Sequence, residues 1–126
     1  LREIVARSGF AERVDFHAPV SNAQLPKILV DVETLVLPSI EEVWGLVVNE
    51  ALAMGLQAVV SDQAGVAPSV SGWEGVFVVP PTREGLESGL RRSRSAWRGP
   101  IPDPKILSFT PEALGEVFID SMKFDR

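Results

Sequence analysis

Short apolar segments alternate with helix-forming segments along this chain, and that alternation restricts its fold more than any other feature. Continuous apolar runs at residues 34–37, 57–61 and 76–79 are typical of strands that are buried on both faces. Residues 13–17 alternate polar and apolar side chains, so we expect a fourth strand there. Strands separated by helices predict parallel βαβ units, and therefore an α/β fold in which helices flank a parallel sheet.

The helices are expected between these strands and at both ends of the chain. Their predicted positions are residues 1–8, 21–31, 45–54 and 82–95, with a single turn within 62–70 and a last helix from Thr110 onward. Ser21 or Asn22 is suited to cap the second of these helices and Thr82 the fourth, because their side-chain oxygens accept from free backbone N–H groups. Gly55 is placed to end the third helix.

Length and charge indicate one acidic domain, residues 1–126. The formal net charge is -5, from 12 Lys and Arg against 17 Asp and Glu. The basic residues gather in one place only, at Arg91, Arg92, Arg94 and Arg98. Such a cluster could bind nucleic acid or anionic lipid, but the acidic balance of the chain favours a solvated helix face. We therefore expect no nucleic-acid partner, and contact with a membrane surface is the weaker alternative.

Several chemistries are excluded by residues that the chain lacks. It has no cysteine, which excludes disulfides and is compatible with a reducing compartment, so we expect a cytoplasmic protein. His17 is the only histidine, and no acidic cluster has metal-ligand spacing, so no protein-held metal or other cofactor is expected. Neither a GxGxxG nor a GxxxxGKS/T motif occurs, which argues against a dinucleotide fold or a P-loop.

The turn at residues 38–45 is where we expect a ligand site. Ligands of doubly wound sheets bind outside the carboxyl ends of the strands, and this turn follows the strand at 34–37. Gly45 has no Cβ to block a close approach, and the N–H groups of Gly45, Leu46 and Val47 begin the next helix without internal partners. These groups can donate to an anion such as a diphosphate.

Two glutamates flank this helix end. Glu50 lies one turn after Leu46 on the same face, so its carboxylate can reach back toward the helix end over about 7.5 Å of helical rise from Gly45. Glu42 lies in the turn and could face a group beyond the diphosphate, such as a sugar. Simpler roles stay open for these residues. Glu42 could only stabilise the helix dipole, and Glu50 could only face solvent. Trp44 could only anchor the core.

The stretch from Pro38 to Asp62 closely resembles one family. It contains Pro38-Ser39-x-x-Glu42-x-Trp44-Gly45-Leu46-Val47-Val48-Asn49-Glu50-Ala51, Ala53-Met54-Gly55-Leu56 and Val59-Val60-Ser61-Asp62. These residues are similar to the E-x7-E segment of the large retaining glycosyltransferase family 4, the group 1 glycosyltransferases. The match continues in Val14-x-Phe16, Val20, Leu25, Gly65-x-Ala67-Pro68, Gly75 and Val79-Pro80. The resemblance implies the C-terminal, donor-binding half of a GT-B fold, with a Rossmann-like parallel sheet flanked by helices.

For the matched residues, the resemblance implies roles in sugar transfer. Glu50 would bind the ribose hydroxyls of the donor nucleotide, and Glu42 would contact and place the transferred sugar as the catalytic residue. The backbone amides of Gly45, Leu46 and Val47 would hold the diphosphate, and Val20 would lie near the base. The intact enzyme would be a hexosyltransferase that moves a sugar from a nucleotide diphosphate sugar to a glycan or lipid acceptor, with retention and without a bound metal.

The chain also departs from the family pattern. The family domain begins earlier, with a strand, a glycine-rich turn, and an Arg and a Lys that neutralise the phosphates. Ala18 stands where the family commonly has Gly, and Gln57 where it commonly has Pro. We therefore expect a fragment truncated at its N-terminal side, inactive alone and prone to self-association through exposed strand edges. A non-catalytic nucleotide-sugar binding module and a structural fragment remain the alternatives.

Overall fold

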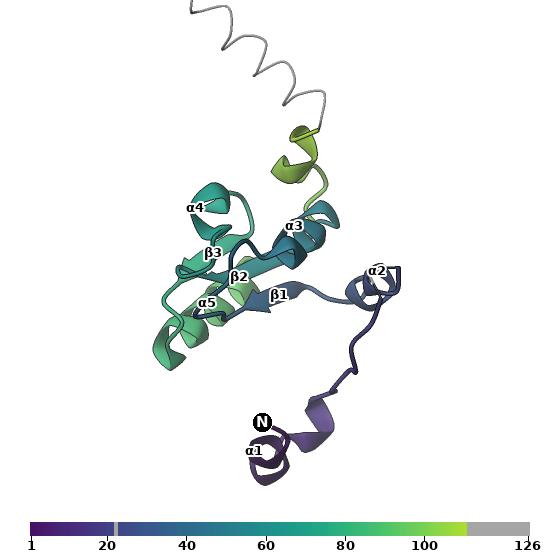
Figure 1. Ribbon diagram of the computed structural model, residues 1–126, viewed down its shortest axis with the longest axis vertical. Helices are drawn as coiled ribbons and strands as arrows, with labels where there is room; N and C mark the ends of the chain where they lie inside the picture. The colour runs from purple at the N-terminus through teal and green to yellow at the C-terminus, as the bar shows by residue number, and fades with distance from the viewer. Residues whose placement is uncertain (22, 111–126) are drawn as a thin grey trace, which may run out of the picture.

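The computed structural model describes residues 1–21 and 23–110, and these residues form a three-stranded parallel sheet (Figure 1). The strand order is β1-β2-β3, with β1 at Thr34–Leu37, β2 at Gln57–Ser61 and β3 at Val76–Val79. Both pairs of neighbours are parallel, and Thr34 lies opposite Gln57 in the first pair. The three apolar runs are therefore strands, and the predicted α/β fold with a parallel sheet flanked by helices is confirmed.

The central strand β2 is buried along its whole length, and one helix packs on each of its faces. On the first face, α3 (Leu46–Ala53) places Val48 and Leu52 in the same apolar cluster as Ala58 and Val60. This packing fixes α3 against the sheet. The turn at residues 38–45 joins the carboxyl end of β1 to α3. The packing of α3 therefore also fixes the position of the predicted ligand turn.

The opposite face of β2 carries α5 (Arg83–Ala96). Alternate residues of a strand point to opposite sides, so Val59 lies on this face. A Cβ added to Gly89 would lie 2.6 Å from Val59 Cγ1, so only glycine permits this close an approach of helix to strand. The predicted cap of α5 is confirmed, because the Gly85 N–H donates to Thr82 Oγ1 at 3.1 Å.

A buried hydrogen-bond network joins α5 to β1 and β2. The Ser93 hydroxyl donates to Gln57 Oε1 at 2.5 Å, and it lies 2.6 Å from Thr34 Oγ1. Because the Ser93 hydroxyl carries a single hydrogen, Thr34 must donate to Ser93. Gln57, which stands where the resembled family commonly has proline, therefore ties the helix to the sheet.

The remaining elements are short: α1 (Arg2–Arg7), η1 (Ala11–Arg13), α2 (Leu25–Leu29), α4 (Ala67–Val70) and η2 (Lys105–Ser108). α1 and η1 bury no residue, and Figure 1 shows them standing away from the sheet. The helix predicted from Thr110 onward lies outside the described residues. Within the part of the chain that the structure describes, every helix is too short or too polar to span a bilayer.

The fourth strand predicted at residues 13–17 is wrong. Arg13 ends the 3-10 helix η1, and the residues that follow pair with no strand among those described. Phe16 lies instead beneath the Arg2 guanidinium, whose carbon is 4.4 Å from the ring centroid. A strand needs a neighbouring strand to accept its hydrogen bonds, and alternating side chains alone cannot supply one.

The second helix is shorter than predicted and begins at a different residue. α2 follows Gln24, whereas Ser21 or Asn22 was expected as its cap, and Asn22 lies outside the described residues. Gln24 Oε1 accepts from both the N–H and the hydroxyl of Ser21, each at 3.2 Å. The N-cap position is Gln24, three residues after Ser21, so Ser21 lies outside the cap position and α2 has no side-chain cap.

Candidate functional site

The N-terminus of α3 is built around Gly45. This glycine is buried and has a φ of 92°, a left-handed conformation that side chains with a Cβ rarely adopt. A Cβ at this position would lie 2.8 Å from Leu37 Cδ2 and 3.5 Å from Glu42 Cγ. The turn therefore requires glycine, and the Glu42 side chain packs beside the helix end.

The first N–H groups of α3 are free to donate. The Gly45 carbonyl accepts from the Val48 N–H at 2.9 Å, which closes the first turn of the helix. Among the described residues, no acceptor pairs with the N–H groups of Gly45, Leu46 or Val47, and no side chain caps the helix. These three groups and the helix dipole give this end of α3 a partial positive charge that favours an anion.

The turn that carries Glu42 is held by the segment after β2. Glu42 forms an isolated parallel bridge with Ala64, and its carbonyl accepts from the Gly65 N–H at 2.9 Å. The Trp44 carbonyl accepts from the Val66 N–H at the same distance. A Cβ on Gly65 would collide with the carbonyl of Val43, so this glycine allows the two segments to meet. The half-buried Glu42 is therefore placed by a backbone ladder.

Glu50 lies one turn along α3 from Leu46, in the wall of a pocket of about 300 Å³. The pocket is otherwise apolar, and its lining comes from α2 and the end of α3: Leu25, Pro26, Leu29 and Met54. Glu50 itself is exposed, and its carboxylate has no hydrogen bond or ion pair with any described residue. An apolar hollow with one free carboxylate can take a flat ring on its walls and hydroxyl groups on its rim.

The structure brings together most of the predicted site. Gly45, Leu46 and Val47 lie at the helix end, with Glu42 packed against Gly45 and Glu50 one turn along the helix. Val20 is 40% exposed and does not line the pocket beside Glu50.

Sequence reasoning missed the apolar wall that α2 supplies, because single apolar residues of a short helix carry no signal of a pocket. It also gave no role to Gly65, although a glycine between two matched segments was a usable signal.

The arginine cluster contacts its own surroundings. Arg91 pairs with Glu87 at 2.7 Å, and the hydrogen bond and charge of this arginine lower the pKa of the Glu87 carboxyl. Arg92 lies over the Phe77 ring, 5.2 Å from its centroid, and Arg98 donates to two backbone carbonyls next to it. These contacts favour the solvated helix face over a docking patch.

An unpaired helix end at the carboxyl edge of a parallel sheet is typical of the class of α/β domains that bind phosphorylated ligands. The family model described as "Glycosyl transferases group 1" matches residues 1–92, and the chain belongs to that family. The prediction of a group 1 glycosyltransferase domain is thus confirmed. In the residues that the structure describes, no group of three or more His, Asp or Glu side chains could hold a metal ion.

Two curated relatives are glycosyltransferases. The D-inositol 3-phosphate glycosyltransferase of Streptomyces griseus subsp. griseus is 37% identical over 79 residues, which are 63% of this chain and 17% of that protein. An uncharacterized glycosyltransferase of Methanocaldococcus jannaschii is 29% identical over 98 residues, which are 77% of this chain and 25% of that protein. The chain therefore spans a quarter or less of the length of these relatives.

One solved structure has the same arrangement of helices and strands. Sucrose-phosphate synthase from Thermosynechococcus elongatus superposes with a TM-score of 0.75 at 23% sequence identity, over 98% of this chain and 34% of that one. At this level of identity the likeness shows the fold alone, which is that of a GT-B-like glycosyltransferase fragment.

Proposed function

We propose that this chain is the donor-binding domain of a retaining hexosyltransferase, which moves a sugar from a nucleotide diphosphate sugar to a glycan or lipid acceptor. One observation carries the proposal: the unpaired N-terminus of α3 has a packed carboxylate, Glu42, beside it and a free carboxylate, Glu50, one turn further along the helix. An anion site between two hydroxyl acceptors suits a diphosphate that joins two sugars.

Each part of the donor has a proposed place. The N–H groups of Gly45, Leu46 and Val47 bind the diphosphate, and Glu50 accepts hydrogen bonds from the ribose hydroxyls. The apolar wall of the 300 Å³ pocket receives the base. Val20, which lies outside this lining, would contact the base as the family resemblance implies. Glu42 contacts the transferred sugar and holds it in the reactive orientation.

The isolated chain is proposed to bind nucleotide without turnover. When the donor breaks, negative charge develops on the leaving diphosphate, and fixed positive groups supply much of its stabilisation. Three backbone N–H groups supply only part of it. The Arg and Lys that the family resemblance implies, and the acceptor site, would belong to the longer protein. A purely binding module differs from this proposal only in lacking transfer.

Calorimetric titration with UDP and GDP tests the site. We expect one of the two nucleotides to bind saturably, and Glu50→Ala to weaken that binding by about tenfold or more, because a charged acceptor of two hydroxyls is lost. Glu41→Ala is the matched control, since Glu41 is exposed in the same turn and has no proposed contact. Equal affinity of Glu50→Ala and the parent chain would contradict the proposal.

The chemistry is tested in the longer protein. Glu42→Gln is expected to lower kcat by roughly 100-fold while leaving nucleotide affinity nearly unchanged, because a misplaced sugar reacts slowly. The anomeric configuration of the product, read by NMR, decides between retention and inversion. Binding of the donor with no transfer to any glycan or lipid acceptor would favour the binding module.

We also propose that the isolated chain self-associates through β1. No described strand pairs with the outer edge of β1, so backbone donors and acceptors are exposed there. Val36→Pro, at the outer edge of β1, tests this contact.

A further inference from the structure

Residues 99–109, which we call the strap, follow α5 and lead into η2, which packs against α3. Pro100, Pro102 and Pro104 are three of the first six residues of the strap. Because each proline ring fixes φ, this part of the backbone is stiff. The family model ends at residue 92, so the strap lies outside the matched part of the chain. The strap thus connects the α5 face of the sheet with the α3 face.

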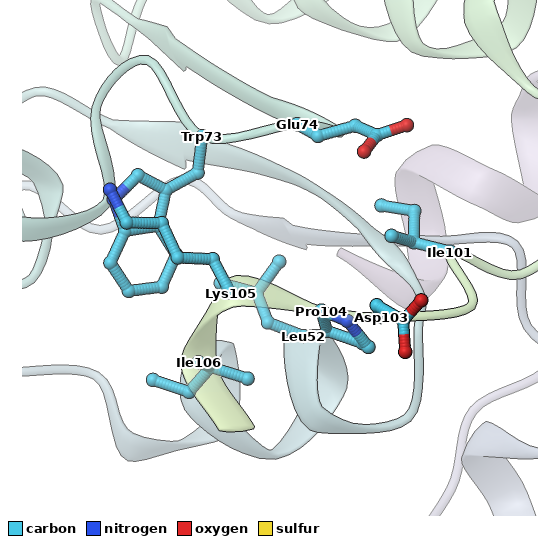
Figure 2. Close-up of a pocket in the computed structure, with 8 residues that line it drawn as sticks. All are labelled: Leu52, Trp73, Glu74, Ile101, Asp103, Pro104, Lys105 and Ile106. Carbon is cyan, nitrogen blue, oxygen red and sulfur yellow. The ribbon is translucent and has the colours of Figure 1, made fainter. Parts of the chain in front are cut away.

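The second half of the strap is fixed on the α3 face. Pro104 is buried, and Ile106 packs against the core cluster that includes Leu52 of α3. Lys105 Nζ lies 5.1 Å from the centroid of the Trp73 ring. Pro104 and Leu52 line one cavity of about 70 Å³, and Figure 2 shows Lys105 reaching past it toward the indole. These contacts hold the end of the strap in place.

The first half of the strap contacts the C-terminal end of α3 through its backbone. The Ile101 N–H donates to the Gly55 carbonyl at 2.9 Å. Gly55 has a φ of 79°, and a Cβ there would lie 2.7 Å from the Ile101 carbonyl oxygen, so only glycine allows this approach. A Cβ on Gly75 would lie 2.5 Å from Ile101 Cδ1. Ile101 therefore contacts the end of α3 and the start of β3 together.

The end of α3 that the strap contacts is also the end that lines the pocket assigned to the nucleotide. Glu50 and Met54 form the α3 side of this 300 Å³ pocket, and α2 forms the other side. The Met54 N–H donates to the Glu50 carbonyl at 3.3 Å, and the Gly55 N–H donates to the Leu52 carbonyl at 2.9 Å. Backbone hydrogen bonds thus connect the strap contact at Gly55 with Glu50 over about one turn of helix.

We propose that the strap positions the nucleoside part of the pocket, and that Ile101 is its positioning residue. The strap holds Glu50 and Met54 at the distance from α2 that a nucleoside requires. The diphosphate end of α3 is held separately, by the ladder between the Glu42 turn and Gly65. Groups that are held in place before a ligand arrives bind it more tightly, because less freedom is lost on binding. The nucleoside assignment rests on the proposed function, whereas the link between strap and pocket does not.

Two glycines with the same backbone conformation give a matched pair of variants. Gly55→Ala forces the strap backbone away from α3, whereas Gly72→Ala introduces the same left-handed strain, at a φ of 78°, with nothing within 4 Å of its Cβ. We expect Gly55→Ala to bind UDP or GDP about tenfold more weakly than Gly72→Ala, because Glu50 is displaced. Inorganic pyrophosphate should bind both variants equally, since it needs only the N-terminal end of α3.

Ile101→Ala is the second variant if Gly55→Ala fails to fold. It keeps the N–H that donates to Gly55 and removes the side-chain contact with Gly75. We expect weaker binding of UDP or GDP with unchanged binding of pyrophosphate. Equal nucleotide affinities of Gly55→Ala and Gly72→Ala would overturn the inference. A parallel loss of pyrophosphate binding would overturn it as well, because the whole helix would then have been disturbed.

The pocket wall can also be followed without nucleotide. Met54 packs against the apolar cluster that contains Leu29 of α2, so the nuclear Overhauser effect between their methyl groups reports the spacing of the two walls. We expect Ile101→Ala to weaken this signal and Gly72→Ala to leave it unchanged. If no nucleotide binds to the parent chain, the proposed donor site fails, and a weakened signal would still support the link between strap and pocket. An unchanged signal in Ile101→Ala would refute that link.

Discussion

The N-terminal segment, residues 1–30, and the sheet region, residues 34–109, differ in how their apolar residues are used. Among the described residues of the first, only Leu29 is buried, whereas Leu1, Ile4 and Phe10 are 84%, 69% and 60% exposed. The sheet region contains the rest of the buried core. The difference shows that apolar side chains become buried only where other segments of the chain can pack against them.

Within residues 1–30, a predicted helix forms and a predicted strand does not. α1 forms close to where it is predicted, although it buries nothing, because a helix closes its hydrogen bonds within its own residues. The strand predicted at 13–17 does not form, because a strand closes its hydrogen bonds only with a neighbour. In an unpacked segment, helical signals are therefore safer than strand signals.

The largest expected effect is in the core beneath α3. Leu52 is 4% exposed and belongs to the main apolar cluster, so Leu52→Ala should lower the free energy of unfolding by about 2–5 kcal/mol. Ile4→Ala in α1 should change it by less than about 0.5 kcal/mol, because Ile4 touches no core. Urea unfolding followed by circular dichroism measures both. Similar losses in the two variants would show that the N-terminal segment packs in solution.

A smaller effect is expected at the contact between the Glu42 turn and the segment after β2. Gly65→Ala places a Cβ against the Val43 carbonyl, so we expect a loss of about 1–3 kcal/mol in unfolding free energy and weaker binding of UDP or GDP. Gly72→Ala is the comparison, because nothing lies within 4 Å of an added Cβ there and only its φ of 78° is strained. Nucleotide affinity should stay unchanged in Gly72→Ala.

The sequence predicted the sheet better than it predicted the site. The run at 57–61 identifies β2 because its three central residues are all apolar, as expected of a strand that is buried on both faces. Thr82 was a correct cap, whereas Ser21 was not, because α2 begins after Gln24, three residues beyond Ser21. The motif names Gly45 and the two glutamates as site residues, and their roles stay a prediction.

A gain of stability is expected on the Asn49 side of α3. Asn49→Leu removes a buried acceptor that has no described partner and adds apolar contact with the hollow between α3, α4 and η2, so unfolding free energy should rise by about 1 kcal/mol. Thermal unfolding of the two chains without ligand measures the change. A loss of stability would show that the amide has a partner in solution.

The smallest effect on unfolding free energy is expected at the outer edge of β1. A substitution there should instead change the oligomeric state. The Gln57 N–H donates to the Glu33 carbonyl at 3.0 Å, so Glu33 and Leu35 direct their backbone groups toward β2. Because backbone groups alternate in direction along a strand, the N–H and carbonyl groups of Thr34 and Val36 point away from β2, toward the outer edge. Val36→Pro then removes an N–H that the fold does not use, and proline is tolerated at such edge positions.

We expect Val36→Pro to convert a self-associating chain into a monomer, with unfolding free energy changed by less than about 0.5 kcal/mol. The blocked edge can no longer add a strand from a second copy, because both the missing donor and the ring oppose pairing. Leu35→Pro, one residue earlier, removes an inward N–H and should unfold the chain instead. Light scattering at several concentrations, combined with urea unfolding, distinguishes the two variants. A parent chain that is already monomeric at high concentration would refute self-association through β1.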